Sequence, residues 1–340
     1  MQNLFDLIKE TPICQWHYYF GIDNNLEAKK PFVDNSNYSD FILNYFKKGG
    51  KVRIFETSGI EPTDLRLPNH ICSVFFLGVL LYYKTSFHKK YKLGNNEPGY
   101  SSYPFIWFLI ALFHDNAYQM ESENALANIS SLDDLEKHFS IEHHLLDKKF
   151  PKCTELIQSR KSYFLFRLQQ WKLIDHGILG GLLLFDRLVK IRREKKLANE
   201  DNLFWGKSLE YQYKLAANAI SIHNIWLPTI ETQENYKKFG LDNLINFKPV
   251  KFRDFPFFYI LGIVDTIEPL KTYQADGFSD KYILENLSFD FRKSSLVVSN
   301  NINSKLDFNK LIAKTIYFEN WLDIGISTSE NSFELTFNIA

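Results

Sequence analysis

Residues 103–115 read YPFIWFLIALFHD, an apolar run that leads directly into His114 and Asp115. Good helix formers dominate this run, so it predicts a buried helix. It is too short to span a membrane, which takes about 20 apolar residues. A carboxylate next to so apolar a segment is costly unless it is paired, and the chain supplies no Lys or Arg close to Asp115. The run therefore indicates a site where a cation meets Asp115.

Four other segments repeat this pattern of an ionisable residue beside an apolar run. Asp265 follows residues 255–264 (FPFFYILGIV), and His223 follows residues 216–222. His176 precedes residues 178–185 (ILGGLLLF), and His70 precedes residues 71–78 (ICSVFFLG). Any one of these is more typical of a hydrogen-bonded core residue than of a ligand. Together they favour a shared cluster of four His and two Asp that binds two transition-metal ions.

The rest of the chain predicts a mainly α protein in three parts. Residues 65–275 have helical periodicity and form the metal-binding domain, and residues 1–64 are a helical extension packed on it. Residues 276–340 predict a small α/β appendix, with strands at 294–299 (SSLVVS) and 332–339 (SFELTFNI) and a helix at 306–322. We expect this appendix to be a structural cap or a subunit contact.

Some small and polar residues have local roles that the sequence suggests. Gly177, Gly180 and Gly181 predict close packing of their helix against a neighbour beside the metal site. Asp175 either caps that helix or is a carboxylate that supports the metal ligand His176 without binding the metal itself. Ser131 is expected to cap the helix that follows it.

Composition restricts the class of protein. The 340 residues carry a formal net charge of zero, which argues against a protein whose main function is to bind the phosphate backbone of nucleic acid. Cys14, Cys72 and Cys153 form no CxxC pair and are odd in number, so a disulfide framework or thiolate zinc site is not expected. The N-terminal residues do not resemble a signal peptide. We therefore expect a cytoplasmic protein that does not enter membranes.

The order of these residues resembles the HD superfamily, which is named after its adjacent His-Asp pair. The string FHD at 113–115 follows an apolar helix, as in the family, and HGILGG at 176–181 is similar to a helix start found in many members. The string DTIEP at 265–269 resembles DYIEP of a branch that hydrolyses diadenosine tetraphosphate symmetrically. The resemblance covers residues 65–273. It departs at residues 116–118, where Asn-Ala-Tyr replaces the frequent Ile-Gly-Lys, and at an insertion over residues 121–159.

The resemblance implies an HD-type helical bundle and a metal-dependent phosphohydrolase or phosphodiesterase. The metals, two divalent ions among Fe, Mn, Zn, Co and Ni, would activate a water molecule. Asp115 would bridge them. Glu268, three residues after Asp265, would share a helix face with it and either accept a proton from the water or orient a ligand, or else be an ordinary helix-end surface residue. The implied ligands are His70, His114, Asp115 and Asp265 for the first ion, and His176 and His223, with Asp115, for the second.

Basic residues near these motifs are candidates for binding a small phosphorylated substrate such as a nucleotide. They are Arg66, Lys172, Arg187 and Lys271. Two other functions stay open: an HD-type di-iron oxygenase, which would use the same ligands, and a non-catalytic nucleotide sensor, to which the missing lysine gives weight. The sequence leaves open whether the protein forms homo-oligomers.

Overall fold

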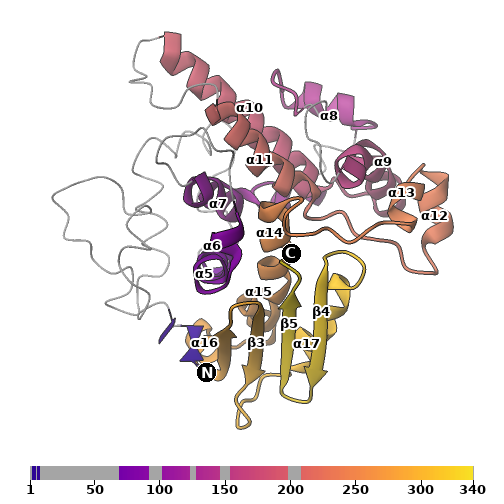
Figure 1. The fold of residues 1–340 in the computed structure, drawn as a ribbon. Helices are drawn as coiled ribbons and strands as arrows, with labels where there is room; N and C mark the ends of the chain where they lie inside the picture. Colours follow the sequence, from indigo (N-terminus) through magenta and orange to yellow (C-terminus); the bar gives the residue numbers. More distant parts are fainter. Residues whose placement is uncertain are drawn as a thin grey trace. The chain divides into compact units, whose positions relative to one another are not determined.

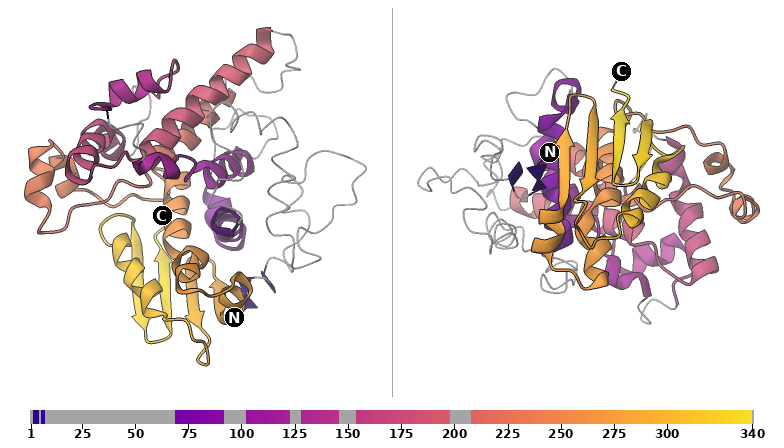
Figure 2. Two further views of the ribbon diagram at one scale, coloured as in Figure 1. Left: turned by 180° about the vertical axis from the view of Figure 1, so that it is seen from behind. Right: turned by 90° about the horizontal axis from the view of Figure 1, so that it is seen from below.

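The structure is a computed structural model that describes residues 2–4, 6–7, 69–91, 102–122, 128–145, 154–197 and 208–339. The chain forms two compact units, which we describe separately (Figures 1 and 2). Unit 1 comprises Met1–Arg53, Glu61–Pro104 and Pro249–Ala340, and unit 2 comprises Ile54–Ile60 and Phe105–Lys248. The predicted N-terminal extension lies almost wholly outside the described residues, and Arg66 lies outside them.

Unit 1 combines apolar helices with the C-terminal sheet. Its helices are α5 (Asn69–Lys84), α6 (Phe87–Lys90), α14 (Pro256–Ile267), α15 (Pro269–Tyr273), α16 (Asp280–Asn286) and α17 (Asn309–Thr315), with the 3-10 turns η5 (Gln274–Asp276) and η6 (Ile316–Phe318). Helix α14 is buried along almost its whole length and packs against α5 and α17. Pro256 starts α14 and Pro269 starts α15, as expected of a residue that lacks a backbone N–H.

The sheet of unit 1 is antiparallel throughout and has the strand order β1-β2-β3-β5-β4. The strands are β1 (Gln2–Asn3), β2 (Leu287–Phe291), β3 (Ser295–Asn300), β4 (Ile324–Ser329) and β5 (Ser332–Phe337). Its register places Phe289, Val298 and Phe333 in one buried row. Phe308, next to α17, stacks on Phe333, so the apolar face of the sheet is covered by the helices of its own unit.

Unit 2 is helical in its described part. Its elements are α7 (Ser102–Phe113, from residue 105 onward), η3 (Tyr118–Ser122), α8 (Leu132–His138), α9 (Thr154–Trp171), α10 (His176–Leu197), α11 (Ser208–Ile222), α12 (Gln233–Lys238) and α13 (Asp242–Ile245). Helices α10 and α11 pack along each other (Figure 1). Ser131 caps α8 by accepting a hydrogen bond from the Asp134 amide at 3.1 Å, as predicted.

The predicted mainly helical class with a small C-terminal sheet is confirmed, whereas the HD-type bundle stays a prediction. The strands expected at 294–299 and 332–339 correspond to β3 and β5. The helix expected at 306–322 is shorter, because α17 and η6 together cover only residues 309–318. The predicted boundary at residue 275 falls inside unit 1. Among the described helices, none combines the length and apolar character needed to cross a membrane.

Candidate metal centre

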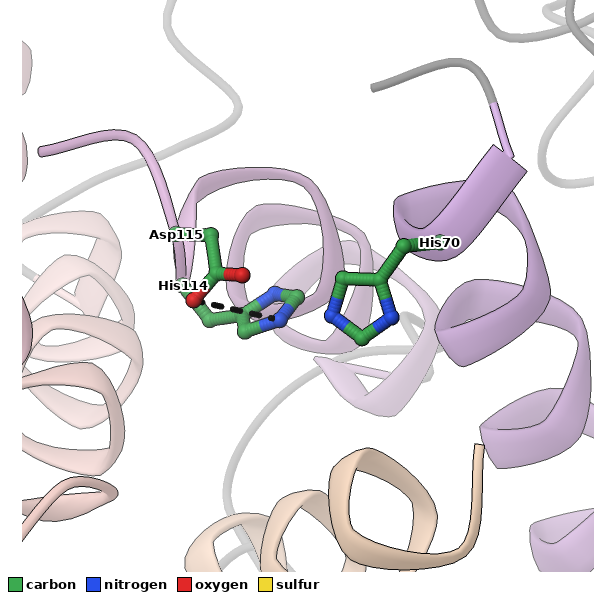
Figure 3. A group of neighbouring side chains, drawn as sticks. All are labelled: His70, His114 and Asp115. Atoms are coloured by element: carbon green, nitrogen blue, oxygen red, sulfur yellow. Dashed lines mark ion pairs between the residues drawn. The ribbon is translucent and has the colours of Figure 1, made fainter. Parts of the chain in front are cut away.

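Four predicted ligands of unit 2 lie at the ends of its apolar helices. His114 and Asp115 follow the last residue of α7, His176 is the first residue of α10, and His223 comes directly after α11. The imidazole of His114 faces the carboxylate of Asp115, with 3.7 Å between Nε2 and Oδ1 (Figure 3). All four side chains are buried. A buried polar group needs a hydrogen bond, and a buried charge needs a partner of opposite charge or a metal ion.

Three of these side chains converge with the spacing of ligands around one ion. Asp115 Oδ1 lies 3.3 Å from His176 Nε2 and 3.8 Å from His223 Nε2, and the two Nε2 atoms are 3.3 Å apart. Two donors that each bind one ion at about 2.1 Å with ordinary coordination angles are about 3.0–3.4 Å apart. The two distances of 3.3 Å lie in this range, and the distance of 3.8 Å requires a wider angle at the ion. Asp115, His176 and His223 therefore form a group that could hold a metal ion.

The other ring nitrogen of each histidine is held by an acceptor. His114 Nδ1 donates to the Ala111 carbonyl at 2.9 Å, and His223 Nδ1 donates to the Ile220 carbonyl at 2.7 Å. A carbonyl oxygen can only accept, so Nδ1 carries the proton in both rings and the neutral tautomer leaves a lone pair on Nε2. The ring orientations are thus fixed by the helix that each histidine follows. In this tautomer, Nε2 of each ring carries the lone pair that a metal ligand needs.

Glu121 of η3 accepts the hydrogen bond from Nδ1 of His176. Glu121 was not among the residues predicted from the sequence. Its Oε1 accepts from His176 Nδ1 at 2.6 Å and from Arg167 Nη2 at 2.8 Å. Burial by itself raises the pKa of Glu121, but the hydrogen bond and the charges of His176 and Arg167 outweigh it, so the pKa is lowered. Glu121 is therefore an ionised partner of His176. Its position at the start of the supposed insertion gave no signal of this role.

His176 lies between two carboxylates, those of Asp115 and Glu121, which favour its protonated form. Burial lowers the pKa of His176, but its hydrogen bonds with Asp115 and Glu121 outweigh that effect and raise the pKa to about 10. The donor set of imidazole nitrogens and a carboxylate suits a transition metal.

The glycines of α10 confirm the predicted close packing beside these ligands. A Cβ on Gly181 would lie 2.5 Å from the Ala217 carbonyl oxygen, and one on Gly177 would lie 2.9 Å from His223 Nδ1. A Cβ on Gly180 would lie 2.3 Å from Asn116 Oδ1. A larger residue at Gly181 would push α10 away from α11, one at Gly177 would displace His223, and one at Gly180 would displace the side chain of Asn116. The glycine spacing therefore sets the distance between His176 and His223.

Asp175 caps α10, which is one of the two roles that the sequence suggested, and its second oxygen binds Asn224 and not His176. Its Oδ1 accepts from the Ile178 amide at 2.8 Å at the start of α10, and its Oδ2 accepts from Asn224 Nδ2 at 3.0 Å. Because Asn224 follows His223, the buried carboxylate ties the start of α10 to the end of α11. It thereby supports the placement of both histidines.

Unit 1 carries the other two predicted ligands, and it brings them together. His70 Nε2 lies 3.2 Å from Asp265 Oδ1, and His70 Nδ1 lies 2.8 Å from Glu268 Oε2. Glu268 is fully buried and also accepts from the amides of Leu270 and Lys271 at 2.7 and 2.8 Å. It therefore caps α15 and orients His70, and it is not the exposed helix-end residue that the sequence left open. The six predicted ligands belong to both units. That all six meet at one site stays a prediction.

The predicted substrate-binding cations have different surroundings. Lys271 Nζ lies 3.6 Å from Asp265 Oδ1, beside the unit 1 pair. Lys172 is exposed at the end of α9, with a positive φ of 57°. Arg187 contacts the Asp186 carboxylate and donates to the Phe139 carbonyl at 2.9 Å. Of these three, Lys271 has a described contact with a predicted ligand.

Comparisons with known proteins add no relative: no family model, curated protein or solved structure matches the chain. The resemblance to the HD superfamily therefore rests on the ordered residues and strings of the sequence. The donor spacing in unit 2 is an independent observation, and it fits a transition-metal ion.

Proposed function

We propose that this protein is a metal-dependent phosphohydrolase or phosphodiesterase that acts on a nucleotide or another small phosphoester. The observation that carries the proposal is the group of Asp115, His176 and His223, whose donor atoms are buried and spaced as ligands of one ion. His114 extends this group through its contact with Asp115. The sequence adds His70 and Asp265 as the remaining ligands of two ions.

Each side chain has a definite task in this proposal. Bound divalent metal supplies a Lewis acid and lowers the pKa of a water molecule toward neutrality. Asp115 contributes negative charge to the ligand set, and the carbonyls of Ala111 and Ile220 keep the histidines in the ligating tautomer. Glu121 does so for His176. These residues hold the ligands ready without rearrangement on metal binding.

In unit 1, Glu268 is a positioning residue for His70. Its oxygens are engaged with two backbone amides and one imidazole, so they are held in place rather than directed at a water molecule. Of the two roles that the sequence left open for Glu268, this geometry favours the orientation of a ligand, His70, over proton transfer. Lys271 adds positive charge next to Asp265, which suits a substrate that carries a phosphoryl group.

The test measures metal and activity on the same purified full-length chain. We expect bound transition metal by elemental analysis, and phosphate or alcohol release from a panel of nucleotides and from bis(p-nitrophenyl) phosphate. His176→Ala and Asp115→Asn should lower both metal content and turnover, the latter by at least about 100-fold. His138→Ala is the matched control, because His138 is an exposed histidine of the same unit.

Three outcomes would contradict the hydrolase. Unchanged metal content in folded His176→Ala protein removes the proposed centre. Bound iron with consumption of O₂, and no hydrolysis, favours the di-iron oxygenase. Tight nucleotide binding with no turnover at any metal favours the sensor.

A further inference from the structure

We propose that Lys314 of α17, together with Lys271, forms a binding site for the phosphoryl group of the substrate, so that the C-terminal part of the chain takes part in substrate recognition. This inference rests on the proposed function and goes beyond it, because residues 276–340 were predicted to be only a structural cap or a subunit contact. All residues of the site belong to unit 1.

Helix α17 brings Lys314 to the helix that follows Asp265. It packs against α14 and α15, and Lys314 Nζ donates to Thr272 Oγ1 at 2.5 Å. Thr272 Oγ1 in turn donates to the Glu268 carbonyl at 3.2 Å. The ammonium group is thus held beside the Asp265–Glu268 segment, in electrostatic contact with both carboxylates and with Lys271.

Lys314 differs from Lys310, which is one turn earlier on α17. Lys310 is half exposed, and its Nζ lies 2.6 Å from both carboxylate oxygens of Asp276. Lys314 is less exposed, and within the described part of the chain no carboxylate lies at ion-pair distance from it. Burial lowers the pKa of Lys314, which is the cost of removing an ammonium from water. A partly dehydrated ammonium that donates to one hydroxyl has further N–H groups for an anion.

The local charges indicate when an anion would be bound. In the metal-free chain, the carboxylates of Asp265 and Glu268 face His70 as well as the positive charges of Lys271 and Lys314. A divalent ion at His70 and Asp265 would leave an excess of positive charge that a phosphate dianion neutralises. Two lysines with a nearby hydroxyl are also suited to phosphoryl oxygens, which accept several hydrogen bonds. We therefore expect phosphate to bind better to the metal-loaded chain than to the metal-free chain.

The experiment titrates the Mn²⁺-loaded full-length chain with inorganic phosphate by calorimetry. Lys314→Met keeps the apolar stem of the side chain and removes the ammonium, and should weaken phosphate binding at least about tenfold. Lys310→Met is the control on the same helix and should bind phosphate as the wild type does. Lys314→Arg keeps the charge and should retain most of the affinity. Metal content and melting temperature are measured on every variant.

Each outcome decides the inference. Equal phosphate affinity in wild type and Lys314→Met overturns it, as does a metal-loaded wild type that binds no phosphate. If Lys314→Met does not fold, Lys314→Gln, which can still hydrogen-bond Thr272, replaces it with the same expectation. A chain that binds metal and loses phosphate affinity in Lys314→Met, yet hydrolyses no phosphoester, contradicts the proposed function and supports this phosphate site.

Discussion

Glu121 is the residue whose substitution should change metal affinity without removing a ligand. Glu121→Gln keeps the shape of the side chain but removes the charge that faces His176 Nδ1. Loss of such a partner typically lowers metal affinity by about 10- to 100-fold. We expect a decrease in that range, measured by competition with a chelator of known affinity.

Glu136→Gln is the control for Glu121→Gln. Glu136 also pairs with a histidine Nδ1, that of His144, at 2.9 Å, but His144 is half exposed and is not a proposed ligand. Its substitution should leave metal affinity unchanged. Equal affinities of Glu121→Gln and wild type would show that Glu121 does not support the centre.

Asp186 offers a second prediction at this scale, on stability and pH. Its carboxylate is buried in α10 and accepts from the amides of Glu142 and His143, both at 2.9 Å. Burial raises the pKa of Asp186, but these amides and Lys190 outweigh it, so the pKa is lowered below its usual value of about 3.9. A lowered pKa means that the stabilisation is complete above the unfolded-state pKa and is lost as the pH falls through the native one.

Asp186→Asn should therefore lower the free energy of unfolding at pH 7 by about 1–3 kcal/mol. The difference from wild type should begin to shrink below about pH 4, where the unfolded chain takes up a proton on Asp186, and should be smallest below the lower native pKa. Urea unfolding of wild type and Asp186→Asn at pH 7, 4 and 3 measures this difference in the free energy of unfolding. A difference that stays constant with pH would mean that the charge of Asp186 contributes nothing.

At the scale of elements, the contact between α10 and α11 determines where two ligands lie. Gly181→Ala would place a Cβ against the Ala217 carbonyl oxygen, and backbone atoms yield less than side chains. We expect destabilisation of about 1–3 kcal/mol and a lower metal affinity, since the helices must separate. Unfolding in urea measures the change in stability, and competition with a chelator measures the change in metal affinity.

Gly325→Ala is the matched control for Gly181→Ala. The nearest atom to its added Cβ is Thr336 Cβ at 3.5 Å, an ordinary contact, so stability and metal affinity should change little. If both glycine variants behave alike, then close approach of α10 and α11 does not position the ligands.

The elements also show what the sequence could predict. The apolar run before His114 predicted helix α7, and small residues predicted the close contact made by α10, because these are local patterns. Glu121 reaches His176 across 55 positions of the chain, and no local pattern reports such a contact. Strand β2 (LSFDF) was not predicted although apolar and polar residues alternate in it, and β4 (IGISTS) gives a weak signal because its second half is polar and exposed.

For the whole molecule, the division of the chain was the hardest feature to predict. Residues 276–340 change in composition, which suggested a separate appendix, yet they belong to the same unit as α5 and α14. Packing of α17 against α14 and α15 depends on contacts between segments distant in sequence. That packing is also what brings Lys314 beside Thr272, so the sequence alone offered no reason to assign a function to Lys314.

Metal binding should be visible in the stability of the whole chain. A ligand that binds only the folded state stabilises it by about 2.7 kcal/mol at a free concentration of 100 times Kd, which corresponds to a melting shift on the order of 5 °C. We expect such a shift with at least one of Mn²⁺, Fe²⁺, Co²⁺, Ni²⁺ and Zn²⁺, and its reversal by a chelator. The shift should persist in His138→Ala and disappear in His176→Ala/His223→Ala, which lacks two of the three convergent donors. Scanning calorimetry of chelator-treated and metal-loaded protein measures it, and an equal shift in the double variant would place the bound metal elsewhere.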